Sequence, residues 1–168
     1  MSNGRPVNIR RNIDDYKDPY IQTQSPSEVT ICSECRSVYH DQRWYLEEQA
    51  LEKVKANRDE LEYTVCPACS KIRDKMPGGI VRLSGGFLSA HREEILNLIH
   101  NEGNRAKQMN PLERVMDIES AGGGVDVLTT NVKLAQKIGK ALHKAYNGEV
   151  NYIWSQDTKL ARVMWQRD

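Results

Sequence analysis

Residues 66–84 read CPACSKIRDKMPGGIVRLS, and this stretch marks a boundary between two kinds of sequence. It begins with a closely spaced cysteine pair, Cys66-Pro-Ala-Cys69, and it ends with Gly79–Ser84, a short segment typical of a strand. A second pair of the same spacing, Cys32-Ser-Glu-Cys35, lies upstream, and no cysteine lies downstream. The stretch therefore predicts a small cysteine-bound module followed by a domain of helices and strands.

The four cysteines favour a metal site. Cys32, Cys35, Cys66 and Cys69 are the only cysteines in the chain. Each CxxC pair folds into a tight turn with both sulfurs on the same side, and two such turns supply four thiolates in a tetrahedron. The pattern predicts a structural Zn²⁺, because four thiolates leave no coordination position open for water or substrate. Iron also suits four thiolates, so the spacing leaves the choice between zinc and iron open.

Two other uses of these residues are weighed against the zinc site. A redox CxxC of the thioredoxin type follows a strand on a βαβ frame, and the lead-in Ser25-Pro-Ser27 before Cys32 does not indicate a strand. His40 lies five residues after Cys35 and could replace one thiol. Because four cysteines already complete a tetrahedral set, zinc bound by cysteines alone is the preferred interpretation.

Composition limits the classes of protein to consider. The chain has 168 residues, 28% of them charged, and a net charge of +1, so any binding of a polyanion must come from local clusters of charge. No run approaches the roughly eighteen apolar residues of a membrane span, and the first residues, MSNGRPVNIRRN, lack the apolar core of a secretory signal. We expect a cytoplasmic protein, in which thiols stay reduced and bind metal more often than they form disulfides.

The order of predicted elements defines three parts: an arm over residues 1–29 that is disordered or ordered by a partner, a four-cysteine zinc ribbon over 30–76, and an α+β domain over 77–168. The last part predicts the order β-α-β-β-α-β with a further strand as hairpin partner, which is the ferredoxin-like arrangement. Both helices then cover one face of an antiparallel sheet. The ribbon is expected to hold a strand-turn-strand over 38–45 and a helix over 46–57. In the domain, strands are expected over 79–84, 113–119, 125–129, 149–154 and 160–165, and helices over 88–108 and 132–146.

The second of these domain helices, VKLAQKIGKALHKAYNG, is basic along one side. Lys133, Lys137, Lys140 and Lys144 fall within about 60° of one another at 100° per residue, and residues 131–148 contain no Asp or Glu. Such a stripe suits a phosphate backbone, where release of counterions favours binding, although a soluble face that is merely basic explains it as well. The nearby Arg73, Lys75 and Arg82 would extend the surface if the fold places them there.

No group of residues supports catalysis. The sequence has no phosphate-binding loop and no nucleophile elbow. Its histidines and paired glutamates lie on predicted helices, where neighbouring positions point in different directions. We therefore predict a protein that is not an enzyme.

The run CPACSKIRDKMPGGIVRLSGGFLSAHREEILNLI, together with MNPLERVMDIE and GGGVDVLTTNVKLAQKIGKALHKAYNGEVNYIW, resembles a family of small bacterial zinc-ribbon proteins. It is similar, more distantly, to the zinc-ribbon core of the nonsense-mediated-decay-three family, the export adaptors of the large ribosomal subunit. The similarity covers roughly residues 30–155, with counterparts at Arg114–Glu119, Gly124–Leu128 and Ala135–Leu142. The adaptors carry further cysteine pairs, domains and export signals that this sequence lacks, so the resemblance implies at most a core that binds RNA or the ribosome.

The sequence thus predicts a zinc-ribbon protein that binds structured RNA without catalysis, with the ribosome or a large-subunit intermediate as its target. The predicted contacts to phosphate are Lys133, Lys137, Lys140, Lys144, Arg73, Lys75 and Arg82. The alternative is a regulatory module whose zinc turns and arm dock a protein partner without touching nucleic acid. Sensitivity of binding to salt and nuclease would separate the two.

Overall fold

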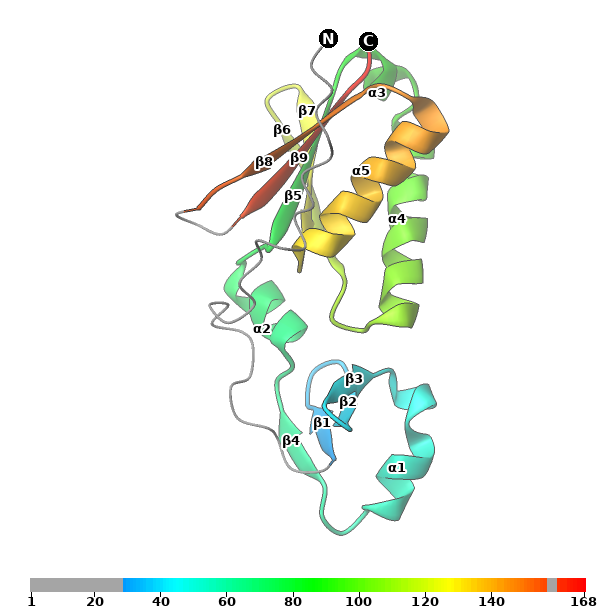
Figure 1. Cartoon of the computed structure of the whole chain (residues 1–168), viewed down its shortest axis with the longest axis vertical. Coiled ribbons are helices and arrows are strands. Elements are labelled where there is room, and N and C mark those ends of the chain that lie inside the picture. The colour runs from blue at the N-terminus through cyan, green and yellow to red at the C-terminus, as the bar shows by residue number, and fades with distance from the viewer. Residues whose placement is uncertain (1–28, 157–159) are drawn as a thin grey trace.

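The computed structural model of the chain describes residues 29–156 and 160–168, so the predicted arm, apart from Val29, and the turn at 157–159 lie outside the described residues. The chain forms a small sheet and a larger sheet, with α2 (Pro67–Asp74) leading from one to the other (Figure 1). Among the described residues no helix is long and apolar enough to cross a membrane.

The small sheet has the strand order β3-β2-β1-β4. β1 pairs antiparallel with β2 and parallel with β4, and β2 pairs antiparallel with β3. The predicted strand-turn-strand is confirmed, and the predicted helix over 46–57 is a 3-10 turn followed by a shorter α-helix. The strand that leads directly into Cys32 was not predicted. The module around the small sheet comprises β1 (Thr30–Cys32), β2 (Val38–His40), β3 (Arg43–Tyr45), the 3-10 turn Glu47–Gln49, α1 (Leu51–Ala56) and β4 (Glu62–Thr64).

The larger sheet has the strand order β6-β7-β5-β9-β8. Local patterns predict its elements well, because alternation and helical periodicity are properties of short segments. The expected helix over 88–108 divides at His91 into α3 and α4. The domain around the larger sheet comprises β5 (Gly79–Ser84), α3 (Gly86–Ala90), α4 (Arg92–Met109), β6 (Val115–Ala121), β7 (Gly124–Thr129), α5 (Val132–Tyr146), β8 (Glu149–Trp154) and β9 (Ala161–Gln166).

The strand order departs from the ferredoxin-like order at one place. β6, β7 and β5 are arranged antiparallel as expected, but the last strand, β9, pairs parallel with β5 and pushes β8 to the edge. β9 suits the inner position because Ala161, Val163 and Trp165 alternate as buried residues, whereas β8 is mostly exposed. The Trp165 indole Nε1 also donates to the Asn147 carbonyl at the end of α5, 2.8 Å away, which fixes β9 beneath that helix.

Helices α4 and α5 both lie on one face of the larger sheet, as predicted (Figure 1). α5 begins at Asn131, whose side chain accepts a hydrogen bond from the Leu134 amide. Gly139 allows α5 to approach the sheet closely, since a Cβ there would lie 2.6 Å from Val163 Cγ1. The buried core between helices and sheet comprises Val81, Leu83, Leu88, Ile95, Ile99, Ala106, Val125, Val127, Leu134, Ala135, Ile138, Leu142, Val163 and Trp165.

Candidate metal centre and basic helix

The first cysteine pair consists of Cys32, the last residue of β1, and Cys35, in the turn between β1 and β2. The Cys32 amide donates to the Ser37 carbonyl at 2.8 Å and the Arg36 amide donates to the Cys32 carbonyl at 3.0 Å, which closes the turn. Arg36 takes a left-handed conformation, with φ of 67°. This conformation lets the chain reverse within four residues and places both sulfurs on the same side.

The second pair opens α2. Cys66 is the residue that caps this helix, and its Sγ accepts a hydrogen bond from the Cys69 amide at 3.4 Å. Pro67 occupies the first helical position, where its fixed φ favours the helix start. The Cys66 amide in turn donates to Cys32 Sγ at 3.3 Å, so a hydrogen bond from backbone to sulfur links the two pairs.

Four sulfurs converge at this point. The Sγ atoms of Cys32, Cys35, Cys66 and Cys69 all lie within 4.8 Å of one another, and all four thiols are free. Cys35 and Cys66 are 3.8 Å apart, far beyond the roughly 2.05 Å of a disulfide. A tetrahedron with metal–sulfur bonds of about 2.3 Å has edges of about 3.8 Å. The cluster therefore has the size and the donor atoms of a four-thiolate metal site.

The structure bears on the two alternatives to a four-cysteine metal site, a redox CxxC pair and His40 as a ligand. β1 precedes the first pair and β4 precedes the second, so the missing strand no longer argues against redox chemistry. The convergence of both pairs on one point does argue for metal, because a redox pair works alone. His40 is not part of the cluster; its ring stacks on Tyr45 and its Nδ1 lies 3.0 Å from Asp41 Oδ2.

Arg114 also contacts the cysteine cluster, which was not predicted from the sequence. It lies just before β6, yet its guanidinium donates from Nη1 to Cys69 Sγ at 3.3 Å, and from Nη2 to Cys35 Sγ at 3.0 Å and Cys66 Sγ at 3.6 Å. No signal in the sequence singles it out, since 45 to 79 residues separate it from these cysteines. The resemblance covered Arg114 without giving it a role.

The thiols and Arg114 influence one another's protonation. Burial raises the pKa of Cys69 to about 11, against the opposing effect of the Arg114 hydrogen bond and charge. The hydrogen bond between the Cys35 and Cys66 sulfurs lowers the pKa of Cys35 and raises that of Cys66. Partial burial acts to lower the pKa of Arg114, but hydrogen bonds to the thiols outweigh it and raise the pKa, so the guanidinium stays charged.

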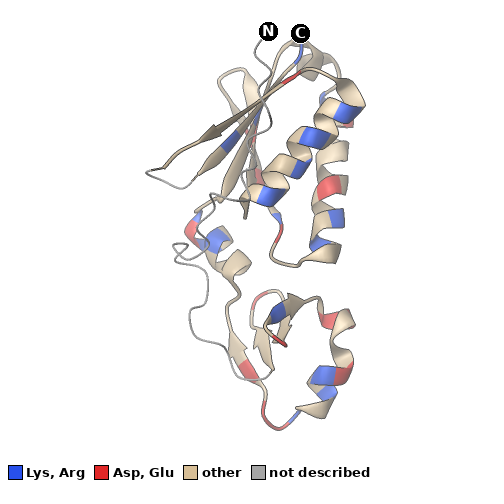
Figure 2. Cartoon of the chain, in the orientation of Figure 1, with Lys and Arg blue, Asp and Glu red and all other residues tan. Residues whose placement is uncertain are grey.

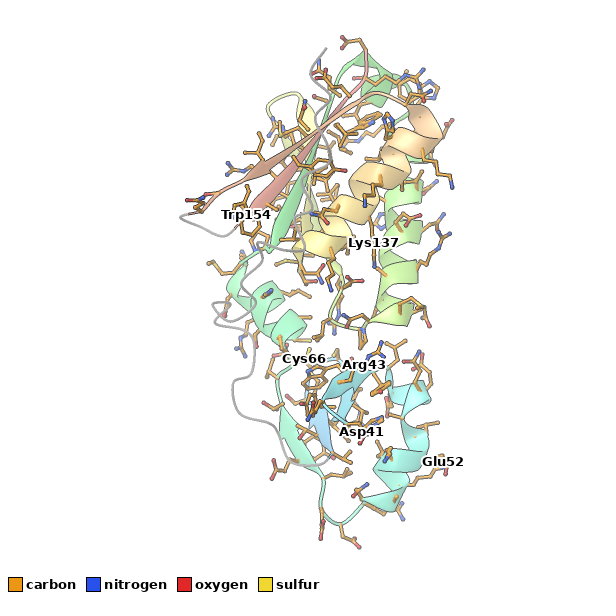
Figure 3. The ribbon with its side chains drawn as sticks, in the orientation of Figure 1. Asp41, Arg43, Glu52, Cys66, Lys137 and Trp154 are labelled. Atoms are coloured by element: carbon orange, nitrogen blue, oxygen red, sulfur yellow. The ribbon has the colours of Figure 1, made fainter. Side chains whose placement is uncertain are left out.

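The basic side of α5 is exposed at all four lysines, and Figure 2 shows it as a series of blue bands on a helix without red. Lys137 differs from the other three. Its Nζ lies 2.9 Å from Oε2 of Glu113, whose side chain is only 3% exposed. Figure 3 shows Lys137 on α5 and Cys66 near the start of α2. Within the described residues no acidic partner contacts Lys133, Lys140 or Lys144.

Of the three residues expected to extend this surface, Arg82 is separated from α5, whereas Arg73 and Lys75 lie together at the end of α2. Arg82 lies on the opposite face of the sheet from α5, where it binds Asp126 at 3.2 Å and the Ala121 carbonyl at 2.8 Å. Arg73 lies on α2, within 3.7 Å of a Glu34 oxygen and 3.6 Å of an Asp74 oxygen. Lys75 is exposed and caps the end of α2 in a left-handed backbone conformation.

No protein-family model, no curated protein and no solved structure matches this chain. The resemblance to the bacterial zinc-ribbon proteins and to the ribosomal export adaptors therefore stays a prediction from sequence.

Proposed function

We propose that this chain is a zinc-binding protein that is not an enzyme and that binds structured RNA through α5, with the ribosome or a large-subunit intermediate as its target in the cytoplasm. The observation that carries the RNA proposal is the exposure of Lys133, Lys140 and Lys144 on a helix with no acidic residue. The four-thiolate cluster carries the zinc proposal.

Zinc would serve a structural role here. The small sheet has only short strands, and the cysteines with Trp44 and Ala68 form one of its two buried clusters. A module of this size commonly depends on metal for its folding free energy. Metal analysis of the purified protein tests this directly: one Zn²⁺ per chain is expected, and an iron content with visible absorption would identify iron instead.

Phosphate binding follows from the spacing of the three lysines. Lys133 and Lys144 are eleven positions apart, about 16 Å along a helix that rises 1.5 Å per residue. Nucleic acid presents several phosphates over that length. Among the described residues no acidic side chain contacts these three lysines, whereas Lys137 neutralises a buried carboxylate. Such contacts position an RNA without reading its sequence, so no sequence preference is expected.

The test replaces Lys133, Lys140 and Lys144 together by Glu and leaves Lys137 in place. The triple variant should lose co-sedimentation with ribosomes and binding to a structured RNA. A companion variant with the three lysines changed to Gln should reduce the slope of log K against log salt by about 2 to 3, since each lysine contributes roughly 0.7 to 0.9.

The matched control carries the same change of charge elsewhere, at Lys55, Arg58 and Arg162, which are all exposed. Lys55 and Arg58 belong to the small module, and Arg162 lies on the face of β9 opposite the residues that pack against α5. The control variant should bind RNA with an affinity closer to that of the wild type than to that of the α5 variant. Equal losses of RNA binding in both triple variants would show that only the net charge matters and would overturn the assignment to α5. Unchanged RNA binding of the α5 variant would also refute the proposal.

The open face of the larger sheet supports the second candidate, a protein-interaction module. Ile80, Leu128 and Met164 alternate with the residues that face α4 and α5, and no described helix covers them. On the edge strand β8, Ile153 pairs with Arg162 on this same face and is 52% exposed. Capture of a protein from lysate that survives both nuclease and high salt would favour this candidate over RNA.

A further inference from the structure

Arg114 joins the metal centre to the larger sheet. Its guanidinium contacts three of the four sulfurs, at 3.0 Å for Cys35, 3.3 Å for Cys69 and 3.6 Å for Cys66. The residue itself belongs to the segment that enters β6. One side chain from the α+β domain thus reaches the cysteines of the small module.

The base of Arg114 is held firmly by the larger sheet. Its Nε donates to the Pro111 carbonyl at 2.7 Å, and its amide donates to Thr130 Oγ1 at 2.9 Å. The Thr130 amide returns a hydrogen bond to the Arg114 carbonyl at 3.0 Å. Thr130 is 1% exposed, so these bonds are shielded from water. The position of the guanidinium is therefore set by the α+β domain and not by the cysteines.

A second connection runs in the opposite direction. Lys71 on α2, the helix that Cys66 opens, donates from Nζ to the Thr130 carbonyl at 2.9 Å. Leu112, two residues before Arg114, packs against the cysteine cluster. Together these contacts connect the cysteines to Thr130 in two ways, through Arg114 and through Lys71 on α2.

Charge explains why the arginine lies here. A divalent ion with four thiolates carries a net charge of −2, and the guanidinium offsets half of it at hydrogen-bond distance. Arginine keeps its charge when partly buried, and its planar fork can bond several sulfurs at once. Groups that hydrogen-bond metal ligands in this way orient them and raise the affinity for the ion.

We propose that Arg114 couples occupancy of the four-cysteine site to the docking of the small module on the α+β domain. Metal binding strengthens the Arg114 contacts and so fixes the small module relative to α5; removal of the metal loosens that interface. By linkage, whatever weakens the interface also weakens metal binding. The proposal rests on the zinc-binding part of the proposed function and does not depend on RNA.

The experiment compares full-length wild type with Arg114→Met, Arg114→Lys and the control Arg82→Met. Arg82, on β5, is a suitable control because its side chain is also partly buried, 31% exposed, and bonds Asp126 and not a cysteine. Zinc affinity is measured by competition with a chromophoric chelator. Hydrogen exchange of the peptide covering residues 128–131 is measured with and without chelator, since it contains the Thr130 amide.

Arg114→Met should bind zinc about 10 to 100-fold more weakly, Arg114→Lys should recover part of this loss, and Arg82→Met should bind as tightly as wild type. Chelation should speed exchange at residues 128–131 in wild type and in Arg82→Met, with little further effect in Arg114→Met. Wild-type affinity in Arg114→Met, or an equal loss in Arg82→Met, would overturn the coupling. A wild-type protein that takes up no zinc would instead refute the metal proposal itself.

Discussion

The Lys137–Glu113 pair offers a sharp test of how α5 is attached and of which lysines are free to bind a ligand. Glu113 lies in the loop before β6 with its side chain 3% exposed, and Lys137 Nζ is 2.9 Å from its Oε2. Its other oxygen, Oε1, lies 3.4 Å from Asn131 Nδ2. Replacing Lys137 by Met keeps the aliphatic stem and leaves the Glu113 carboxylate buried without its cation.

The size of the effect follows from the burial of the two ends. Removing one partner of a fully buried pair costs about 3–5 kcal/mol, whereas exposed pairs contribute about 0–1 kcal/mol. Here one end is buried and the other is 48% exposed, so we expect a loss of about 3 kcal/mol, at the low end of the buried range. For a chain of this size that lowers Tm by about 6 to 12 °C.

Chemical and thermal denaturation measure the loss, with Lys133→Met as the matched control on the same helix. The control should lie within about 0.5 kcal/mol of wild type because Lys133 is exposed. Adding Glu113→Gln to Lys137→Met should recover much of the stability, since no charge then remains buried. If Lys137→Met is no less stable than Lys133→Met, the pair contributes nothing to stability and Lys137 belongs with Lys133, Lys140 and Lys144.

Two further predictions concern the metal and the packing of α5. Chelation should loosen the small module and expose Trp44, because Trp44 packs against the cysteines. The Trp44 signal is the fluorescence of wild type minus that of a Trp44→Phe variant, which leaves the buried Trp165 in place. An unchanged Trp44 signal in metal-depleted protein would contradict a structural ion. Gly139→Ala should destabilise the protein by about 1–3 kcal/mol through overpacking, since its Cβ would meet Val163 at 2.6 Å, while Gly86→Ala has open space and should not. A stabilised Gly139→Ala variant, as helix propensity alone favours, would show that α5 can move away from the sheet.

Much of the local structure could be predicted because it depends on short segments. The alternation of β5 and the helical period of α5 are readable from neighbouring residues, and their bounds agree with the structure. The cysteine cluster was predicted for a similar reason, because each CxxC turn is local and two of them have few ways to satisfy four thiolates.

The strand order could not be predicted in the same way. Both β8 and β9 have the composition of strands, and only packing beneath α5 decides that β9 takes the place beside β5. The strand β1 was also missed, since three residues are too few to show a period. Such choices depend on partners distant in the sequence.

The sequence by itself determined which residue types were present for a site: four thiols at metal spacing and four lysines along one helix. Only the tertiary structure decided which groups contact each of these side chains. It set Glu113 against Lys137, turned Arg82 to the other face of the sheet and brought Arg114 to the cysteines. Periodicity states which side of an element a residue occupies, but a charge acquires its role from the groups within a few ångströms, and folding supplies those from remote parts of the chain.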